Sequence, residues 1–360
     1  MDWATSMRSV SGLNWISNKG EDMNKYDFPK VDLHLHLDGS FRIETMYELA
    51  QERNVELPGE TLEGYGEWMK EHSDAVDVND YLRMFDYPTA VLQDKASLTR
   101  ITKELIEDIA KQGVRYAEIR FAPQIHTHKD LSQRDAIEAV LEGKKIGEAE
   151  NPAIKTGIIL CMMCFGPETV NYDENMETAT IAHEYLDKGV VCIDLAGAEG
   201  IVPLSNFKPF FDKAQELETP CICHAGDSQD WHTIKDAIDM GALRIGHGHH
   251  IYENPELCRY AAKKCIALEI CPTSNIQCKS RESFPMHPAY NLYKLGIPVT
   301  INTDNMVMAR TTLDDEYDHC INEMGYDHKD IIRSNINSFK VSFAPEDYKE
   351  EMIKELESLL

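Results

Sequence analysis

The sequence alternates short, continuous hydrophobic runs with longer segments in which hydrophobic residues recur at helical spacing. The short runs are rich in Ile, Val and Leu without strict alternation, which is typical of parallel strands buried on both faces of a sheet. Eight of these runs predict strands, at residues 31–36, 114–121, 155–162, 190–195, 220–224, 243–247, 266–271 and 298–303.

Glycines mark the ends of several helix-like segments that precede these runs. A glycine just past a helix takes the left-handed conformation that ends it. Repeated strand–helix units over roughly 330 residues favour an α/β fold, specifically a (β/α)8 TIM barrel. The alternative is an open doubly wound sheet, but glycine-rich phosphate-binding patterns follow none of the predicted strands. The helical segments are 97–112, 176–188, 230–240 and 287–295, followed by Gly113, Gly189, Gly241 and Gly296.

The segment between the first two predicted strands, residues 37–113, is too long for one crossover helix. We expect extra helices inserted here after the first strand, where they would form a lid above the barrel mouth. Residues 23–360 are predicted to form a single barrel domain. Residues 1–22 are mixed and polar, and we interpret them as a disordered N-terminal extension or as an artefact of an upstream start codon.

Histidine and aspartate residues stand at the ends of several predicted strands. His34 and His36 are two apart in one strand, so their side chains share a face. His224, His247 and Asp304 each follow a hydrophobic run and begin a polar or glycine-rich turn. Because barrel active sites lie at the carboxyl ends of strands, these residues predict one metal site. Imidazoles with a carboxylate suit Zn²⁺, with iron or manganese as weaker options, and a catalytic zinc lowers the pKa of water to about 7.

Composition limits the partners and the compartment. The net charge of −26 would repel phosphate backbones and anionic lipid, so we expect a small-molecule substrate and neither nucleic acid nor a membrane. No hydrophobic run approaches the length of a membrane-spanning helix. Ten cysteines are dispersed along the chain, which favours free thiols in a cytoplasmic protein over a disulfide scaffold. The oligomeric state does not follow from the sequence.

Two further residues follow strand ends, and each has two interpretations. Asp227 lies three residues after His224 and could act on a substrate as an acid, or could cap the following helix. Gly197 could offer a backbone N–H to a ligand, or could serve only the geometry of a turn. The pattern alone does not decide between these interpretations.

Seven segments together resemble the adenosine deaminase family of metal-dependent amidohydrolases. They are VDLHLHLDGS, YAEIRFAPQ, IDLAGAEG, HAGD, RIGHGHH, CPTSN and INTDN, and they occur in the family's order and approximate spacing. The resemblance covers about residues 29 to 345 and is strongest to bacterial adenosine deaminases. It implies hydrolytic deamination at purine C6, which converts adenosine or 2′-deoxyadenosine to inosine or 2′-deoxyinosine and ammonia.

The resemblance also implies roles for individual residues. His247 would orient the attacking hydroxide, and Asp304 would accept a hydrogen bond from it. Gly197 would donate its N–H to purine N3, and Asp38 would bind the ribose 5′-hydroxyl beside His36. One zinc ion per chain would be bound by His34, His36, His224 and Asp304.

Two positions depart from the family pattern. Asp227 stands where the family has a glutamate that donates a proton to purine N1, and its side chain is one methylene shorter. A displacement of about 1 Å at a reacting group can cost on the order of 10²-fold in rate. Asn305 stands where the family has an aspartate that binds purine N7, and an amide NH₂ donates to N7 without having to be protonated.

These departures leave alternatives open. The chain could deaminate another 6-aminopurine, such as adenine or a modified nucleoside. It could also be a pseudoenzyme that binds purines without turnover, because of Asp227. Phosphoester hydrolysis in a related barrel usually uses two metals and a bridging lysine, and no lysine stands at the fourth or fifth predicted strand end.

Overall fold

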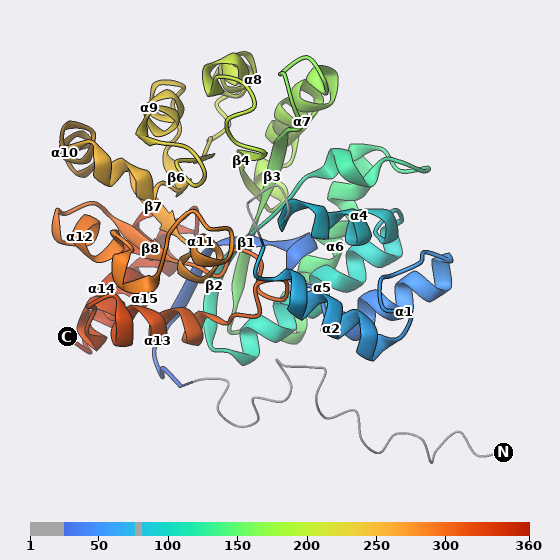
Figure 1. The fold of residues 1–360 in the computed structure, drawn as a ribbon, viewed down its shortest axis with the longest axis horizontal. Coiled ribbons are helices and arrows are strands. Elements are labelled where there is room, and N and C mark those ends of the chain that lie inside the picture. Colours follow the sequence, from blue (N-terminus) through green and yellow to red (C-terminus); the bar gives the residue numbers. More distant parts are fainter. Residues whose placement is uncertain (1–24, 76–80) are drawn as a thin grey trace.

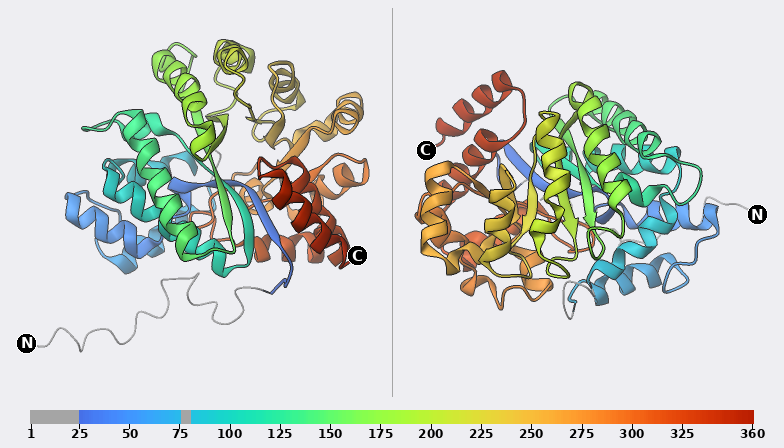
Figure 2. Two further views of the ribbon diagram at one scale, coloured as in Figure 1. Left: turned by 180° about the vertical axis from the view of Figure 1, so that it is seen from behind. Right: turned by 90° about the horizontal axis from the view of Figure 1, so that it is seen from above.

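The computed structural model describes residues 25–75 and 81–360, so the interpretation of residues 1–22 lies outside the described part. Parallel strands form the centre of the molecule, and helices surround them (Figures 1 and 2). The strands are β1 (Lys30–His36), β2 (Val114–Phe121), β3 (Lys155–Cys164), β4 (Val190–Gly197), β5 (Cys223–Ala225), β6 (Arg244–His247), β7 (Ala267–Ile270) and β8 (Val299–Ile301).

Strands β1 to β4 form one parallel sheet in chain order, and β5 to β8 form a second. Isolated parallel bridges connect the sheets on both sides, pairing Leu35 with Asp304 and Ile193 with Cys221. The Asp304 amide donates to the His34 carbonyl at 2.8 Å, and the His36 amide donates to the Asp304 carbonyl at 2.7 Å. The predicted (β/α)8 barrel is therefore confirmed.

All eight predicted strands occur, but four of them, β5 to β8, are shorter than predicted. Strands β5 and β8 begin after Pro220 and Pro298, which lack an N–H and contribute only carbonyl acceptors. The Pro220 carbonyl accepts from Ile193 at 3.0 Å, and the Pro298 carbonyl accepts from Leu268 at 2.9 Å. The hydrophobic pattern of the sequence predicts the whole buried segment. Only part of that segment forms the backbone hydrogen bonds that define the strand.

The predicted helix ends are also found. Gly113, Gly189, Gly241 and Gly296 have φ between 82° and 118°, which is the left-handed conformation expected after a helix. None of the described helices is long and apolar enough to cross a membrane. The helices are α1 (Ile43–Arg53), α2 (Leu62–His72), α4 (Asp86–Val91), α5 (Lys95–Lys111), α6 (Gln133–Glu150), α7 (Tyr172–Glu184), α8 (Lys208–Glu216), α9 (Trp231–Asp239), α10 (Pro255–Lys264), α11 (Pro272–Gln277), α12 (Ala289–Lys294), α13 (Leu313–Glu323), α14 (His328–Val341) and α15 (Glu346–Glu357).

The expected insertion after the first strand contains α1, α2, α4 and α5 (Figure 1). The chain around α4 carries Tyr81, Phe85 and Thr89 to the wall of the central cavity. Tyr81 is buried. The extra helices are therefore present as the length of the segment predicted, and the chain around α4 lines the cavity.

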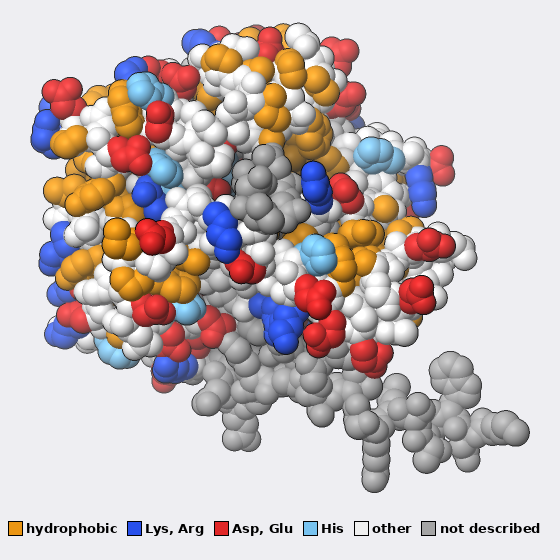
Figure 3. Space-filling model, viewed as in Figure 1, with side chains coloured by type: hydrophobic (Ala, Val, Ile, Leu, Met, Phe, Trp, Pro, Cys, Tyr) orange, Lys and Arg blue, Asp and Glu red, His pale blue; other side chains and the backbone are white. Residues whose placement is uncertain are grey.

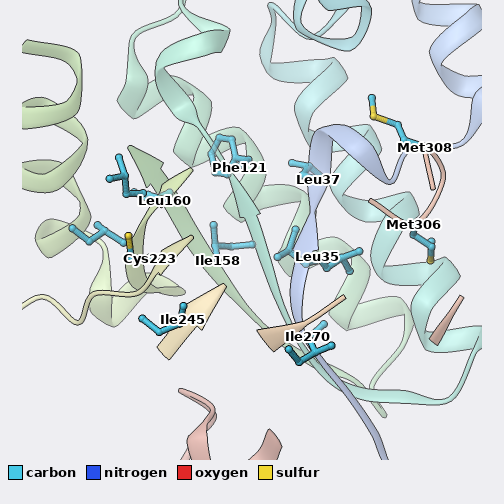
Figure 4. Packing of buried hydrophobic residues seen from close by; sticks show 14 of the residues in the cluster. Leu35, Leu37, Phe121, Ile158, Leu160, Cys223, Ile245, Ile270, Met306 and Met308 are labelled. Carbon is cyan, nitrogen blue, oxygen red and sulfur yellow. The ribbon is translucent and has the colours of Figure 1, made fainter. Parts of the chain in front are cut away.

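The two faces of the strands differ in chemistry. Outward side chains such as Leu35, Leu160 and Ile245 belong to a large hydrophobic cluster shared with the surrounding helices (Figure 4). The barrel interior instead contains charged side chains that are at most 1% exposed. Buried charges are rare unless they are paired, and these form one connected network beneath the cavity. Its members are Glu118, Arg120, Asp194, Arg244 and Glu269.

Candidate metal centre and active site

A cavity of about 770 Å³ opens at the carboxyl ends of the strands. The ends of β1, β4, β5, β6 and β8 all contribute residues to its wall. The sequence placed its candidate residues at these ends, and the fold brings them together. The candidates that line the cavity are His36, Asp38, Gly197, His224, Asp227, His247, Asp304 and Asn305.

Three histidines and one aspartate offer their ligand atoms at close range. His36 Nε2 lies 3.3 Å from His224 Nε2 and 3.4 Å from Asp304 Oδ1. His34 Nε2 lies 3.5 Å from Asp304 Oδ1, is buried, and has no hydrogen-bond partner among the described residues. A tetrahedral zinc with bonds of about 2.1 Å separates its ligand atoms by about 3.4 Å. The four residues therefore fit a zinc ion.

Carboxylates behind the histidines fix which ring nitrogen faces the centre. His34 Nδ1 lies 3.0 Å from Glu269 Oε2, and His224 Nδ1 lies 2.9 Å from Asp194 Oδ2. Arg120 connects the two carboxylates, with contacts of 2.8 Å to Asp194 and 2.7 Å to Glu269. A carboxylate partner keeps the proton on Nδ1, so the Nε2 lone pairs of His34 and His224 are available for a metal.

At three of the four candidate ligands, the electrostatics favour the protonation state that binds a metal. Burial lowers the pKa of His34 and lowers that of His36 well below its usual range. Burial opposes ionisation of Asp304, but the neighbouring imidazoles outweigh it and hold its pKa well below the ordinary value. Burial opposes the charged form of His224 too, but Asp194 outweighs it and raises its pKa. Metals bind neutral imidazoles and ionised carboxylates, so the pKa shifts of His34, His36 and Asp304 favour metal binding, whereas the raised pKa of His224 opposes it.

The backbone is strained at two of the strand ends that carry the site. His247 and Asp304 both have φ of 61°, a conformation that residues other than glycine rarely adopt. Gly246 lies between the imidazoles, where a Cβ would come within 3.0 Å of His34 Cε1 and 3.2 Å of His224 Cγ. A glycine is therefore needed for the histidines to approach one another.

Asp227 is a cavity residue and does not cap a helix, so the capping interpretation is wrong. Helix α9 is capped by Asp230, whose side chain accepts from the His232 amide at 2.9 Å. Asp227 Oδ1 accepts from Asn275 Nδ2 and Ser280 Oγ, each at 2.8 Å. Among the described residues, the other oxygen of this carboxyl accepts no hydrogen bond, so it is the oxygen available to a ligand.

The pKa of the Asp227 carboxyl follows from these contacts. Burial disfavours its charged form, but the interaction with His247 and the hydrogen bonds from His249 and Ser280 outweigh burial and lower the pKa. Asp227 is therefore ionised in the free protein at neutral pH. His249 Nε2 lies 3.3 Å from Oδ1, and Arg281 Nε donates to His249 Nδ1 at 2.8 Å.

A short chain of hydrogen bonds sets the orientation of His247. His287 Nδ1 accepts from the Ala289 amide, so His287 Nε2 donates to Asn275 Oδ1 at 3.2 Å. The Asn275 amide nitrogen then donates to both Asp227 and His247 Nδ1, the latter at 3.1 Å. A neutral His247 must consequently carry its proton on Nε2.

The remaining candidates lie around the same centre. Asp38 follows β1 in a short helical turn, and burial raises the pKa of its carboxyl to about 7. Asn305 Nδ2 donates to Asp304 Oδ1 at 2.8 Å, which leaves its second N–H available. Gly197 ends β4 with φ of 110°, where a Cβ would lie 2.6 Å from the Cys164 carbonyl oxygen.

The residues that support this site were not identified in the sequence analysis above. A signal for them exists, because charged residues occur within strands that are otherwise hydrophobic. Glu118 and Arg120 are two apart in β2, while Asp194 and Glu269 stand among hydrophobic residues in β4 and β7. Side chains two apart share a face, so this pattern predicts a charged barrel interior.

Comparison with known proteins places the chain in a family. The family model described as adenosine deaminase matches residues 29–359. The adenosine deaminase of Haemophilus ducreyi is 39% identical over 80% of this chain and 83% of that protein. The adenosine deaminase of Clostridium acetobutylicum is 35% identical over 92% of this chain and 98% of that protein.

A solved structure agrees with this placement. The adenine deaminase of Arthrobacter aurescens superposes with a TM-score of 0.83 at 25% identity, covering 92% of this chain and 98% of that one. The family model and the bacterial relatives span nearly the whole chain, and the cavity contains the histidines and aspartates on which the resemblance depended. The chain is a metal-dependent aminohydrolase and belongs to the adenosine deaminase family.

Proposed function

We propose that the protein catalyses zinc-dependent hydrolytic deamination of adenosine and 2′-deoxyadenosine, releasing inosine or 2′-deoxyinosine and ammonia. The observation that carries this proposal is the convergence of His34, His36, His224 and Asp304 beside Asp227 in one cavity. One zinc ion per chain would be held by the first four residues. A bound zinc ion supplies the Lewis acidity that makes water a nucleophile near neutral pH.

The residues around the metal would orient the purine. The Gly197 N–H would donate to N3, and the free N–H of Asn305 would donate to N7. Asp38 would bind the ribose 5′-hydroxyl, with His36 beside it. His247 carries its Nε2 proton on the side remote from Asn275, so it would donate to the attacking oxygen and stabilise charge there.

Asp227 would transfer a proton to purine N1. Its carboxyl is ionised in the free protein, so it must gain a proton when the purine covers it, because a buried carboxylate facing a lone pair is unfavourable. Asn275, Ser280 and His249 hold Oδ1, which aims the other oxygen toward the cavity. Protonation of N1 would make C6 electrophilic, so that the oxygen of water could add to C6. Departure of the 6-amino group as ammonia would then restore the conjugated ring.

The partners would be small purine molecules. The charge of −26 supports this proposal against nucleic acid, and acidic side chains are interspersed with basic ones on the face shown in Figure 3. All ten cysteines are free, which supports a reducing compartment such as the cytoplasm. Two alternatives keep specific support. The Arthrobacter aurescens neighbour is an adenine deaminase, and Asp227 is the departure that would characterise a purine-binding pseudoenzyme.

Substitution of Asp227 tests the proposal. A general acid contributes about 10²–10⁴-fold, so Asp227→Asn should lower kcat on adenosine at least about a hundredfold with the metal content unchanged. Asp227→Glu should keep or raise activity, because the glutamate side chain is one methylene longer and has the length that is usual in the family. The matched control is Asp230→Asn, which changes an exposed carboxylate in the same loop and should leave kcat near wild type.

The outcomes separate the candidate functions. A greater kcat/KM on adenine than on adenosine would show that the substrate is the free base and not the nucleoside. No turnover of any 6-aminopurine by wild type, with activity gained in Asp227→Glu, would establish the pseudoenzyme. A near wild-type kcat in Asp227→Asn would refute the acid role of Asp227.

A further inference from the structure

Glu199 lies on the loop after β4, two residues beyond Gly197, and lines the cavity. Its carboxylate accepts hydrogen bonds from the four consecutive backbone N–H groups of residues 226–229, at 2.6–3.1 Å. The hydroxyl of Thr233 donates to the same carboxylate. A carboxylate that accepts several backbone N–H bonds fixes the path of the chain that supplies them. The segment held in this way contains Asp227.

The loop that carries Glu199 is itself anchored. The Ala198 amide donates to the Cys164 carbonyl at 3.0 Å, which ties the loop to the end of β3. Gly200 packs against the Gln229 side chain, and a Cβ on Gly200 would lie 2.4 Å from Gln229 Nε2. The loops after β4 and β5 are therefore joined to each other, and the Glu199 carboxylate accepts the hydrogen bonds between them.

We propose that Glu199 is a positioning residue that holds Asp227 at a fixed position relative to Gly197. This inference rests on the proposed function, in which Asp227 acts at purine N1 and Gly197 donates to N3. These two ring atoms are separated by a single carbon, so the groups that address them must keep a fixed spacing. Asp227 has a short side chain, so it depends on its backbone position for reach.

The expected effect of losing the carboxylate follows from its contacts. Glu199→Gln retains one acceptor oxygen and turns an NH₂ group toward backbone N–H donors, which leaves some of the four amides without a partner. The loop would then relax. A displacement of Asp227 by about 1 Å would lower kcat by about 10- to 100-fold. The metal site would stay intact, because Glu199 contacts none of the metal-binding side chains in the described structure.

A double-mutant cycle distinguishes positioning from general stability. We expect Glu199→Gln to lower kcat on adenosine by about 10- to 100-fold with zinc content unchanged. In the Asp227→Asn background, the same change should cost less than about threefold, because Glu199 acts through Asp227. Ser228→Ala is the matched control. It removes a hydroxyl 3.4 Å from Glu199 but keeps the backbone amide, and it should leave kcat near wild type.

Amide hydrogen exchange gives a readout that does not need turnover. Faster exchange of the 226–229 amides in Glu199→Gln, together with the non-additive loss of kcat, would support the proposal. Unchanged exchange, an unchanged kcat, or an equal loss in both backgrounds would overturn it. If wild type deaminates no 6-aminopurine, the proposed function fails, whereas the exchange result still decides whether Glu199 holds the loop.

Discussion

Substitution of Asp194 tests how the buried charges support the metal site. Its Oδ2 lies 2.9 Å from His224 Nδ1 and 2.8 Å from Arg120 Nη1. The side chain is fully buried, so water cannot replace it. We predict that Asp194→Asn weakens zinc binding without removing any metal ligand, because the Nδ1 proton of His224 loses its charged acceptor.

The geometry limits the size of the effect. Loss of such a partner costs about 10- to 100-fold in metal affinity. Both contacts of Asp194 involve the same oxygen, so the amide oxygen of an asparagine can keep both while the negative charge is lost. A neutral acceptor bonds about half as strongly as a charged one. We therefore expect the lower end of the range, about tenfold, which corresponds to about 1.4 kcal/mol.

The control comes from the same network. Glu118→Gln neutralises a carboxylate of similar burial that pairs with Arg244 and contacts no histidine of the site. Both variants should lower the free energy of unfolding, because each weakens a buried ion pair. Competition with a chromophoric zinc chelator measures the affinity. Equal zinc affinity in Asp194→Asn and wild type, or an equal loss in both variants, would refute the reasoning.

Three other predictions follow from the same structure. His36→Ala should lose both metal and activity, because it removes one of the four side chains proposed to bind the ion, and zinc retained on elemental analysis would contradict this. If Asn305 donates to N7, 7-deazaadenosine should lose about 1–3 kcal/mol in kcat/KM relative to adenosine, whereas Asn305→Asp should keep activity; equal values for the two substrates would disprove the role. Burial raises the pKa of Glu316 to about 8, above its ordinary 4.5, so wild type loses stability as the pH rises through this window. The free energy of unfolding of Glu316→Gln, relative to that of wild type, should thus increase from pH 5 to pH 8 by at most about 1.4 kcal/mol per pH unit. A difference that does not change with pH in urea unfolding would contradict this prediction.

The fold followed from the sequence because local signals agreed with one another. Hydrophobic runs located the strands, and glycines such as Gly113 and Gly189 marked helix ends through their left-handed backbone. The ladder ends were less predictable, because β5 and β8 shorten where a proline supplies only a carbonyl. Burial alone does not reveal which buried residues pair.

The candidate site was predictable only in part. Residues such as His34 and Asp304 stand at strand ends and carry obvious metal-binding groups. The contacts of Asp227 could not be foreseen, because Asn275 and Ser280 come from the segment after β7 and meet it only in the folded barrel. Glu199 was missed for a related reason, since its role depends on backbone amides that carry no sequence signal.

The most direct test of the account is the conversion of adenosine to inosine by purified protein, followed by the change in ultraviolet absorbance before and after metal removal. We predict turnover by the protein as isolated, loss of turnover after treatment with a strong chelator, and recovery when about one equivalent of zinc per chain is restored. Turnover that persists in metal-free protein, or no turnover of adenosine by the zinc-loaded protein, would contradict the account.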